Sequence, residues 1–242
     1  MTPSTESLFV LLLVLLYLHD SLALLYGNEA LLEWRRQPRL LFGSDMLRVS
    51  GKELVLPSPW TPWRPLFRLA WHVQPALPDA AQPAPTDFAK LARALVPMRW
   101  CLPQIAAGLF VGLPLCVYRN TGWTPFLLVV AVIYAGIASA VVLLWFARRE
   151  LGVSKRRFAA LAFECLACPP CALNIIRHVA VALPICDDAV MVARAKLAAA
   201  EAGAAIGEIL RRVDAEMEAT DDGSEQWREL AEFRARLAEA AT

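Results

Sequence analysis

The chain has 242 residues, of which 57% are hydrophobic and 19% are charged, and its formal net charge is +1. This composition is more apolar than that of an average soluble protein and favours a membrane protein. The near-zero net charge argues against nucleic acid or an acidic substrate as a partner. The lipid bilayer is therefore the first partner that the sequence predicts.

The first expected element is an apolar helix that makes segment 1–26 a membrane anchor. Residues 8–18 are continuously apolar, and we expect His19 and Asp20, which follow, to lie in water at the membrane interface. A cleaved signal peptide is the alternative, but the first seven residues lack the Lys or Arg of such peptides. A basic cluster follows the anchor at Arg35, Arg36 and Arg39. Because the more basic flank stays in the cytoplasm, the amino terminus is predicted to lie outside.

Segment 27–100 is predicted to be a cytoplasmic loop that begins with a β-hairpin. Residues 46–56 alternate partly between apolar and polar types around Ser50 and Gly51, which is typical of two strands joined by a tight turn. Residues 75–85 are rich in Pro and Ala and are typical of a semi-rigid linker.

A Pro- and Trp-rich stretch at 57–65 separates the predicted β-hairpin from this linker. Its four prolines exclude a regular helix or a central strand. Trp60, Trp63 and Trp71 have two interpretations: a surface for a protein partner, or a belt at the membrane surface. We favour the belt, because indole rings prefer the membrane interface and basic residues lie beside them.

Segment 101–147 is predicted to be an antiparallel transmembrane helical hairpin. Two uncharged apolar runs, at 101–118 and 126–147, are joined by only seven residues, and each is long enough to cross a bilayer. The basic flank after the second run includes Arg148, Arg149, Arg156 and Arg157, which we expect at the membrane interface. The sequence therefore predicts a multi-pass protein of a bacterial-type inner membrane, with three transmembrane helices and a cytoplasmic carboxyl terminus.

Small residues in both runs predict close helix packing. Gly108 and Gly112 form a G-x-x-x-G pattern, and Ala131, Ala135 and Ser139 recur every four residues. Such spacing lets helix backbones approach closely in lipid, within one chain or in a homo-oligomer. Pro103 and Pro114 are expected to bend or locally unpair their helix. The lack of charged residues in the runs disfavours transport through one copy, although an oligomeric channel remains an alternative.

Segment 148–186 is predicted to be a basic flank followed by a Cys-rich helix–break–helix at the inner membrane surface. Glu164 and Asn174 make a fourth span costly, and two prolines break the helix between them. The thiols of Cys165, Cys168 and Cys171 have the C-x2-C-x2-C spacing of iron–sulfur ligands. His178 or Cys186 is a possible fourth ligand in a tetrahedral metal site.

Two other interpretations of these cysteines compete with the metal site. A redox C-x2-C is one, although the surrounding sequence has no βαβ pattern. The other is that each Cys is a small buried apolar residue, which agrees with our expectation that no cofactor binds. On the cytoplasmic side thiols usually stay reduced, so we expect no disulfide.

Segment 187–242 is predicted to be an amphipathic αα-hairpin outside the membrane. Two apolar stripes at helical spacing lie on either side of a polar turn at 221–224. The first stripe contains Ile206, Ile209, Leu210, Val213 and Met217, and the second contains Trp227, Leu230, Phe233 and Leu237.

No catalytic motif accompanies these elements, so the sequence predicts a mainly α membrane protein more clearly than it predicts an activity. The leading hypothesis is a non-catalytic inner-membrane anchor, adaptor or assembly protein. It would present its cytoplasmic helices to a membrane or cytoplasmic protein partner. The alternatives are a membrane-bound metal or iron–sulfur protein and an oligomeric channel.

Overall fold

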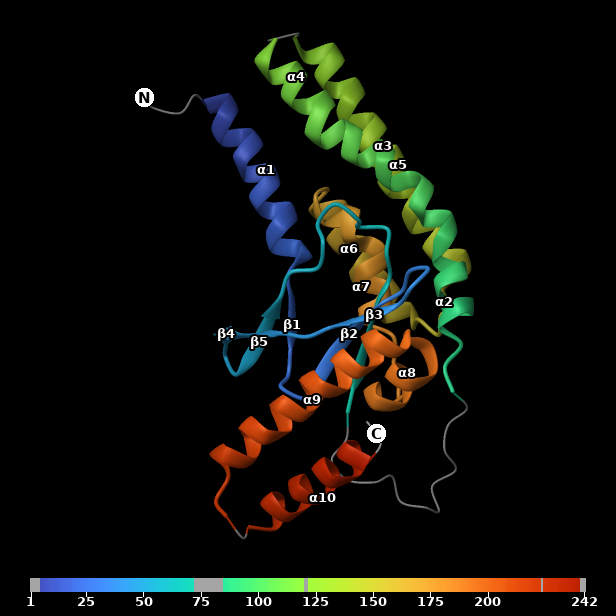
Figure 1. The fold of residues 1–242 in the computed structure, drawn as a ribbon. Coiled ribbons are helices and arrows are strands. Elements are labelled where there is room, and N and C mark those ends of the chain that lie inside the picture. Colours follow the sequence, from blue (N-terminus) through green and yellow to red (C-terminus); the bar gives the residue numbers. More distant parts are fainter. Residues whose placement is uncertain (1–4, 72–84, 120–121, 223, 240–242) are drawn as a thin grey trace. The chain divides into compact units, whose positions relative to one another are not determined.

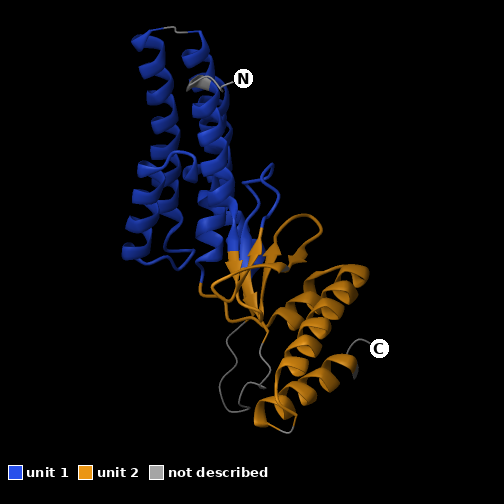
Figure 2. Cartoon of the chain, turned by 90° about the vertical axis from the view of Figure 1, so that its left-hand side faces the viewer, with its two compact units in different colours: residues 1–23, 56–67, 87–183 blue, residues 24–55, 68–86, 184–242 orange. Residues whose placement is uncertain are grey.

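The computed structural model describes residues 5–71, 85–119, 122–222 and 224–239, which are mostly helical with small antiparallel sheets (Figure 1). The chain forms two compact units (Figure 2). Unit 1 contains residues 1–23, 56–67 and 87–183, and unit 2 contains residues 24–55, 68–86 and 184–242. Each unit is thus assembled from three stretches of sequence. Most of the predicted linker at 75–85 lies outside the described residues.

Unit 1 contains two helices that are long and apolar enough to cross a membrane, at Phe88–Tyr118 and Trp123–Ala147. The first comprises α2 (Phe88–Leu95), η1 (Val96–Trp100), α3 (Cys101–Ala107), η2 (Gly108–Gly112) and α4 (Leu113–Tyr118), and the second is α5 (Trp123–Ala147). The two apolar runs of the predicted hairpin are therefore helical. The amino-terminal helix α1 (Thr5–Ser21) is apolar but has 17 residues, so the described chain does not confirm a third membrane-length helix.

Pro114 accounts for an irregularity in the first long helix. Proline has no N–H, and its ring clashes with the carbonyl of the residue four positions earlier. The preceding η2 is a π-helical turn, in which the Leu113 N–H donates to the carbonyl of Gly108. The predicted local unpairing is thus present as one wider turn.

Glycines let this helix approach α5 closely. A Cβ atom on Gly108 would lie 2.4 Å from Cγ1 of Ile133, and one on Gly136 would lie 2.9 Å from Cγ1 of Ile105. Real Cβ atoms do not approach so closely, so both positions need glycine as the helices now lie. The Gln104 side chain adds a hydrogen bond of 3.0 Å to the Val132 carbonyl.

The end of unit 1 is a helix–break–helix, as predicted. α6 (Lys155–Ala167) begins where the Ser154 hydroxyl accepts the N–H of Arg157. A turn at 168–170 follows, and the chain then continues into η3 (Cys171–Asn174) and α7 (Ile175–Val181). The prolines at 169 and 170 explain the break, because neither can donate a helical hydrogen bond.

The strands form two three-stranded sheets, most of whose residues belong to unit 2. The strand orders are β1–β5–β4 and β3–β2–β6. The strands are β1 (Ala23–Leu25), β2 (Glu29–Glu33), β3 (Arg39–Leu41), β4 (Ser44–Val49), β5 (Lys52–Val55) and β6 (Leu66–Ala70). Antiparallel β4 and β5 confirm the predicted hairpin. Ser50 and Gly51 have φ of 52° and 77°, which is typical of a type I′ turn.

The carboxyl-terminal part of unit 2 is helical. α8 (Ala189–Lys196), α9 (Ala199–Ala219) and α10 (Glu225–Glu239) follow one another, and α9 packs against α10. Six residues of the predicted stripes are buried: Ile206, Ile209, Val213, Leu230, Phe233 and Leu237. The Ser224 hydroxyl caps α10 by accepting the N–H of Trp227 at 3.1 Å. The predicted pair of amphipathic helices is thus present.

Candidate functional site

The most unusual group of side chains in unit 1 is a buried polar cluster on α1, η3 and α7. Asn174 is fully buried and Arg177 is 4% exposed. Burial of such groups is unfavourable unless they form hydrogen bonds. Their partners come from two distant stretches of sequence, which shows how unit 1 is held together.

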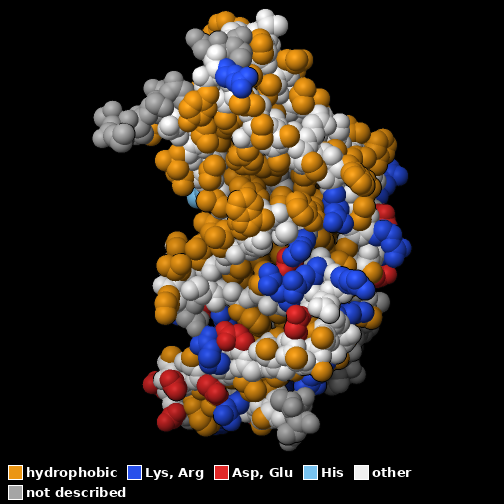
Figure 3. Space-filling view, turned by 45° about the horizontal axis from the view of Figure 1, so that its top comes forward, with side chains coloured by type: hydrophobic (Ala, Val, Ile, Leu, Met, Phe, Trp, Pro, Cys, Tyr) orange, Lys and Arg blue, Asp and Glu red, His pale blue; other side chains and the backbone are white. Residues whose placement is uncertain are grey.

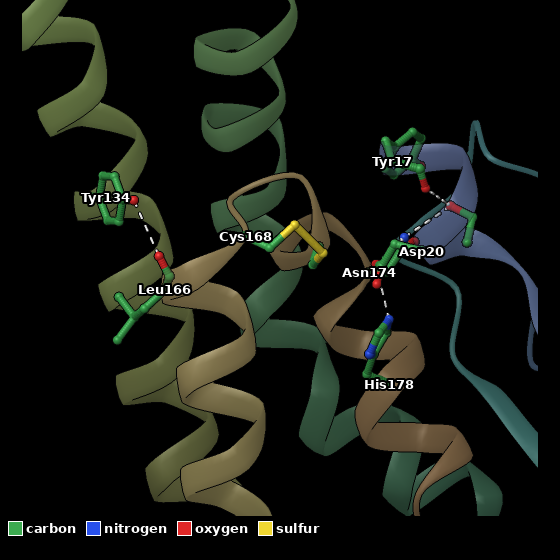
Figure 4. Close-up of a disulfide and its surroundings, with 9 residues drawn as sticks. Tyr17, Asp20, Tyr134, Leu166, Cys168, Asn174 and His178 are labelled. Carbon is green, nitrogen blue, oxygen red and sulfur yellow. Dashed lines mark hydrogen bonds and ion pairs between the residues drawn. A yellow bond between two sulfur atoms is a disulfide. The ribbon is translucent and has the colours of Figure 1, made fainter. Parts of the chain in front are cut away.

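Asn174 joins α7 to the end of α1. Its side-chain amide donates to Oδ2 of Asp20 at 2.9 Å and to the hydroxyl of Ser21 at 3.0 Å (Figure 4). The Ser21 hydroxyl in turn donates to the Tyr17 carbonyl at 2.8 Å. The sequence predicts that Asp20 is solvated at the membrane interface. In the structure, Asp20 also accepts a hydrogen bond from the buried side chain of Asn174.

His178 contacts the same carboxylate. Its Nε2 lies 3.1 Å from Oδ2 of Asp20 (Figure 4). Burial opposes the charged imidazolium, but the hydrogen bond and charge of Asp20, with the charge of Glu164, outweigh it and raise the pKa of His178 above its ordinary value. Asp20 therefore favours the protonated form of His178, and the two side chains are paired with each other.

Arg177 binds the Pro- and Trp-rich loop. Its Nη2 donates to the carbonyls of Ser58 and Thr61 at 2.6 and 2.9 Å. The Tyr17 hydroxyl donates to the carbonyl of Pro59. The peptide groups on both sides of Trp60 are thus fixed, whereas the Trp60 side chain is 84% exposed. An exposed indole on a fixed backbone can serve as an anchor at an interface.

Two of the predicted metal ligands form a disulfide. Cys168 and Cys171 are joined, which differs from the expectation that the thiols stay reduced. In this state neither can supply the thiolate that a metal requires. Cys165 is buried and free, and Cys186 is exposed in unit 2. Within the described residues no three His, Cys, Asp or Glu side chains are placed to hold a metal ion. The metal or iron–sulfur hypothesis therefore stays a prediction without support from the geometry.

The predicted helix-packing residues divide into two groups. Gly108 and Gly112 face α5, where a Cβ on Gly112 would lie 2.8 Å from Cγ1 of Val129. Ala131, Ala135 and Ser139 are exposed, and the buried stripe of α5 instead contains Ile133, Gly136, Ile137, Ala140 and Leu144. The G-x-x-x-G residues of the first helix therefore lie at the contact with α5, whereas α5 makes this contact through a stripe next to Ala131, Ala135 and Ser139.

The residues predicted to lie at the membrane interface differ in how exposed their side chains are. Arg148 is mostly buried, with its guanidinium 3.9 Å from the ring centroid of Trp145. The side chains of Arg149, Arg156 and Arg157 are exposed, and that of Trp63 is half-buried. Trp71 departs from the predicted tryptophan belt. It is 3% exposed in unit 2, and its backbone N–H donates to the Asn28 carbonyl at 3.1 Å.

Unit 2 has a buried polar group of its own. Glu53 on β5 accepts hydrogen bonds from Arg212 on α9 and from Arg48 on β4. Arg212 also donates to the Gly43 carbonyl at 2.7 Å and to Glu208 at 2.8 Å. The Arg212–Glu53 contact joins α9 to β5, whereas the Arg48 contact lies within the sheet and the Glu208 contact lies within α9. A buried, mutually bonded group of this kind is typical of a structural ion pair.

The fold and these clusters define a mostly helical protein with two membrane-length helices and a separate α+β unit. No protein-family model, curated protein or solved structure matches the chain. The sequence analysis did not predict that Asn174 and Arg177 are buried and join distant segments of unit 1 by hydrogen bonds. Their signal was present, since a polar and a charged residue within an apolar stretch are costly unless bonded.

Proposed function

We propose that this protein is a non-catalytic integral membrane anchor or adaptor that presents unit 2 to a protein partner. Its topology would have three spans, with the amino terminus outside a bacterial-type inner membrane and the carboxyl terminus in the cytoplasm. The observation that carries the proposal is the apolar surface of the unit 1 helices. Figure 3 shows hydrophobic side chains gathered over these helices.

The surface of α5 supports a lipid-facing helix. Leu127, Leu128 and Phe146 are 58%, 66% and 76% exposed, respectively. The core helix of a soluble protein would bury such side chains, and monomeric soluble proteins rarely expose large contiguous apolar patches. Exposed leucines continue on α1, at Leu8, Leu11, Leu12, Leu15 and Leu16. A bilayer accounts for both helices at once.

The contacts of α1 support its retention as a span rather than its removal as a signal peptide. At about 1.5 Å per residue, its 17 residues extend over roughly 25 Å, close to the thickness of a bilayer core. The Tyr17 ring packs edge-on against Phe110, with the ring centroids 5.7 Å apart. Cleavage after α1 would remove the partners of Asn174, which is fully buried.

Basic residues support the orientation. Arg93 and Arg99 precede the apolar part of the first long helix, and Arg148 and Arg149 follow α5. The short connection between the two helices carries Arg119 alone among Lys and Arg. The positive-inside rule then puts that connection outside and α6 and α7 inside.

An edge strand of unit 2 supports the adaptor role. β4 is the last strand of its sheet, and Met46, Leu47 and Val49 on it are 94%, 57% and 53% exposed. An apolar edge strand is a template for an added strand from another protein. A register shift between Ser44 and Arg48 limits unrestricted edge pairing.

The topology can be tested with cysteines introduced one at a time into a cysteine-free variant. We expect Cys at position 119 to react with a membrane-impermeant maleimide in intact cells, and Cys at position 150 to react only after lysis. The matched substitutions are Arg119→Cys and Glu150→Cys, since both side chains are exposed. Equal labelling of both in intact cells, or release of the protein from membranes by alkaline carbonate, would overturn the three-span anchor.

The partner surface can be tested by placing a photo-crosslinking amino acid at Met46 in native membranes. Glu218 is the matched control, because it is exposed in the same unit but lies on α9. The adaptor proposal expects a discrete cross-linked protein from position 46 and none from position 218. Identical patterns from both positions would contradict a specific partner surface on β4.

A further inference from the structure

The disulfide in unit 1 lies in an accessible turn. Cys168 and Cys171 are three residues apart, and both side chains are half-buried rather than enclosed. The Cys171 N–H donates to the Cys168 carbonyl at 2.9 Å, which closes a tight turn. The disulfide joins the two side chains across this turn (Figure 4). The surrounding chain therefore does not bury either cysteine fully.

This disulfide is expected to add little to the stability of the fold. A disulfide stabilises mainly by restricting the unfolded chain, and the effect is smallest for short loops. The turn already has backbone hydrogen bonds, including one of 3.0 Å from the Cys168 N–H to the Glu164 carbonyl. Pro169 and Pro170 restrict the same turn further. The fold therefore has little need of the covalent bond.

A third cysteine lies one helical turn earlier but is unsuited to react. Cys165 is 4% exposed on α6. Burial, together with the negative charges of Asp20 and Glu164, raises the pKa of its thiol to about 12. Cys165 therefore remains a protonated thiol near neutral pH and does not compete with the pair at 168 and 171.

We propose that Cys168 and Cys171 form a thiol–disulfide exchange site whose substrate is an accessible cysteine pair of another protein. This activity goes beyond the proposed anchor role. It rests on that role only for its compartment, because disulfides on the cytoplasmic side are usually transient and catalytic or redox-sensing.

The reaction balances with a dithiol as the reductant. One partner thiolate attacks a sulfur of the Cys168–Cys171 bond, a mixed disulfide forms, and the departing sulfur takes up a proton. The second partner thiol then loses its proton and attacks the mixed disulfide, which releases the other cysteine. Two electrons and two protons pass from the partner to the pair, and the partner becomes a disulfide.

A redox titration of the purified full-length protein in detergent tests the site. The protein is equilibrated with mixtures of reduced and oxidised dithiothreitol, alkylated without unfolding, and mapped by mass spectrometry. We expect Cys168 and Cys171 to be modified together and reversibly, with the slope of a two-electron couple, while Cys165 stays unmodified. Protection of the pair from excess reduced dithiothreitol, or a pair that never forms a disulfide, would overturn the proposal.

Trapping provides a second measurement that separates exchange from simple exposure. Cys171→Ser leaves Cys168 as a thiol, and the probe is a fluorescent peptide whose two cysteines are joined in a disulfide. The Cys168 thiolate attacks that disulfide, one peptide sulfur forms the mixed disulfide, and the other leaves as a thiol. We expect this variant to retain the probe at least tenfold more than Cys168→Ser/Cys171→Ser, in which exposed Cys186 is still present. Equal retention would contradict an exchange site. Neither measurement needs a membrane, so a failed topology experiment would leave both interpretable.

Discussion

Arg212 on α9 donates a hydrogen bond to the carboxylate of Glu53 on β5, 159 residues earlier in the chain. Both side chains are nearly inaccessible, at 6% and 3% exposure. The guanidinium also lies 5.4 Å from the ring centroid of Phe42. Because these contacts attach the carboxyl-terminal helices to the sheet, the pair is decisive for the integrity of unit 2.

Removal of one member of this pair should destabilise unit 2 strongly. Arg212→Met leaves the Glu53 carboxylate buried without its main cation, which we expect to cost about 3–5 kcal/mol. Thermal melting of the detergent-solubilised protein measures the loss. The double variant Glu53→Met/Arg212→Met should lose less than Arg212→Met, because no buried charge is left alone. A double variant as unstable as the sum of the singles would contradict this coupling.

The sequence predicted local features of the fold well because each depends on neighbouring residues. The turn at Ser50 and Gly51 needs only two residues that tolerate positive φ. The polar turn at 221–224 and the apolar runs of the long helices likewise carry their signal within a few turns of chain.

Features that depend on distant contacts were not predictable in the same way. Asn174 and Asp20 meet across 154 residues, and no local pattern indicates that distance. The Ala131 stripe was plausible by spacing, but the rotation of α5 is set by packing against Gly108 and Ile105. The three-span topology remains a prediction, since α1 falls short of membrane length as described.

Loss of the Arg177 side chain should increase the mobility of the Pro- and Trp-rich stretch at 57–65. Arg177→Met removes two charge-assisted hydrogen bonds to the Ser58 and Thr61 carbonyls, each worth about 1.5–3 kcal/mol. Hydrogen exchange by mass spectrometry should show faster exchange in peptides covering 56–65. Arg156→Met is the control, because that side chain is exposed on α6. An unchanged exchange rate in Arg177→Met would show that the hydrogen bonds from Arg177 do not hold residues 57–65 in place.

The pairing of His178 with Asp20 predicts a pH-dependent stability for unit 1. The pKa of His178 is raised in the folded chain, so protonation favours folding. The stabilisation is complete below the unfolded His pKa of about 6.5 and is lost as the pH rises through the higher folded value. Apparent melting temperatures between pH 5 and 9 measure this effect.

Two variants assign the pH dependence to that pair. Asp20→Asn removes the charge that raises the His178 pKa, and the decline in stability should shrink or shift to lower pH. His19→Gln is the control, since His19 is exposed on the same helix. If His19→Gln abolished the decline and Asp20→Asn preserved it, the titrating group would have been assigned wrongly.

Close contact between the two membrane-length helices predicts that Gly108 tolerates no side chain. In Gly108→Ala the new Cβ would lie 2.4 Å from Cγ1 of Ile133, so the helices must separate or Ile133 must move. Overpacking of this kind costs about 1–3 kcal/mol, and we expect a lower melting temperature in detergent.

Gly207→Ala makes the same substitution in a helix that has room for it. No atom lies within 4 Å of a Cβ at Gly207 on α9, and alanine favours helices by about 0.5–1 kcal/mol over glycine. This variant should therefore be neutral or stabilised. A Gly108→Ala protein as stable as Gly207→Ala would show that the hairpin helices are not packed through Gly108. The opposite responses of two identical substitutions would identify steric contact with Ile133, rather than glycine flexibility, as the cause.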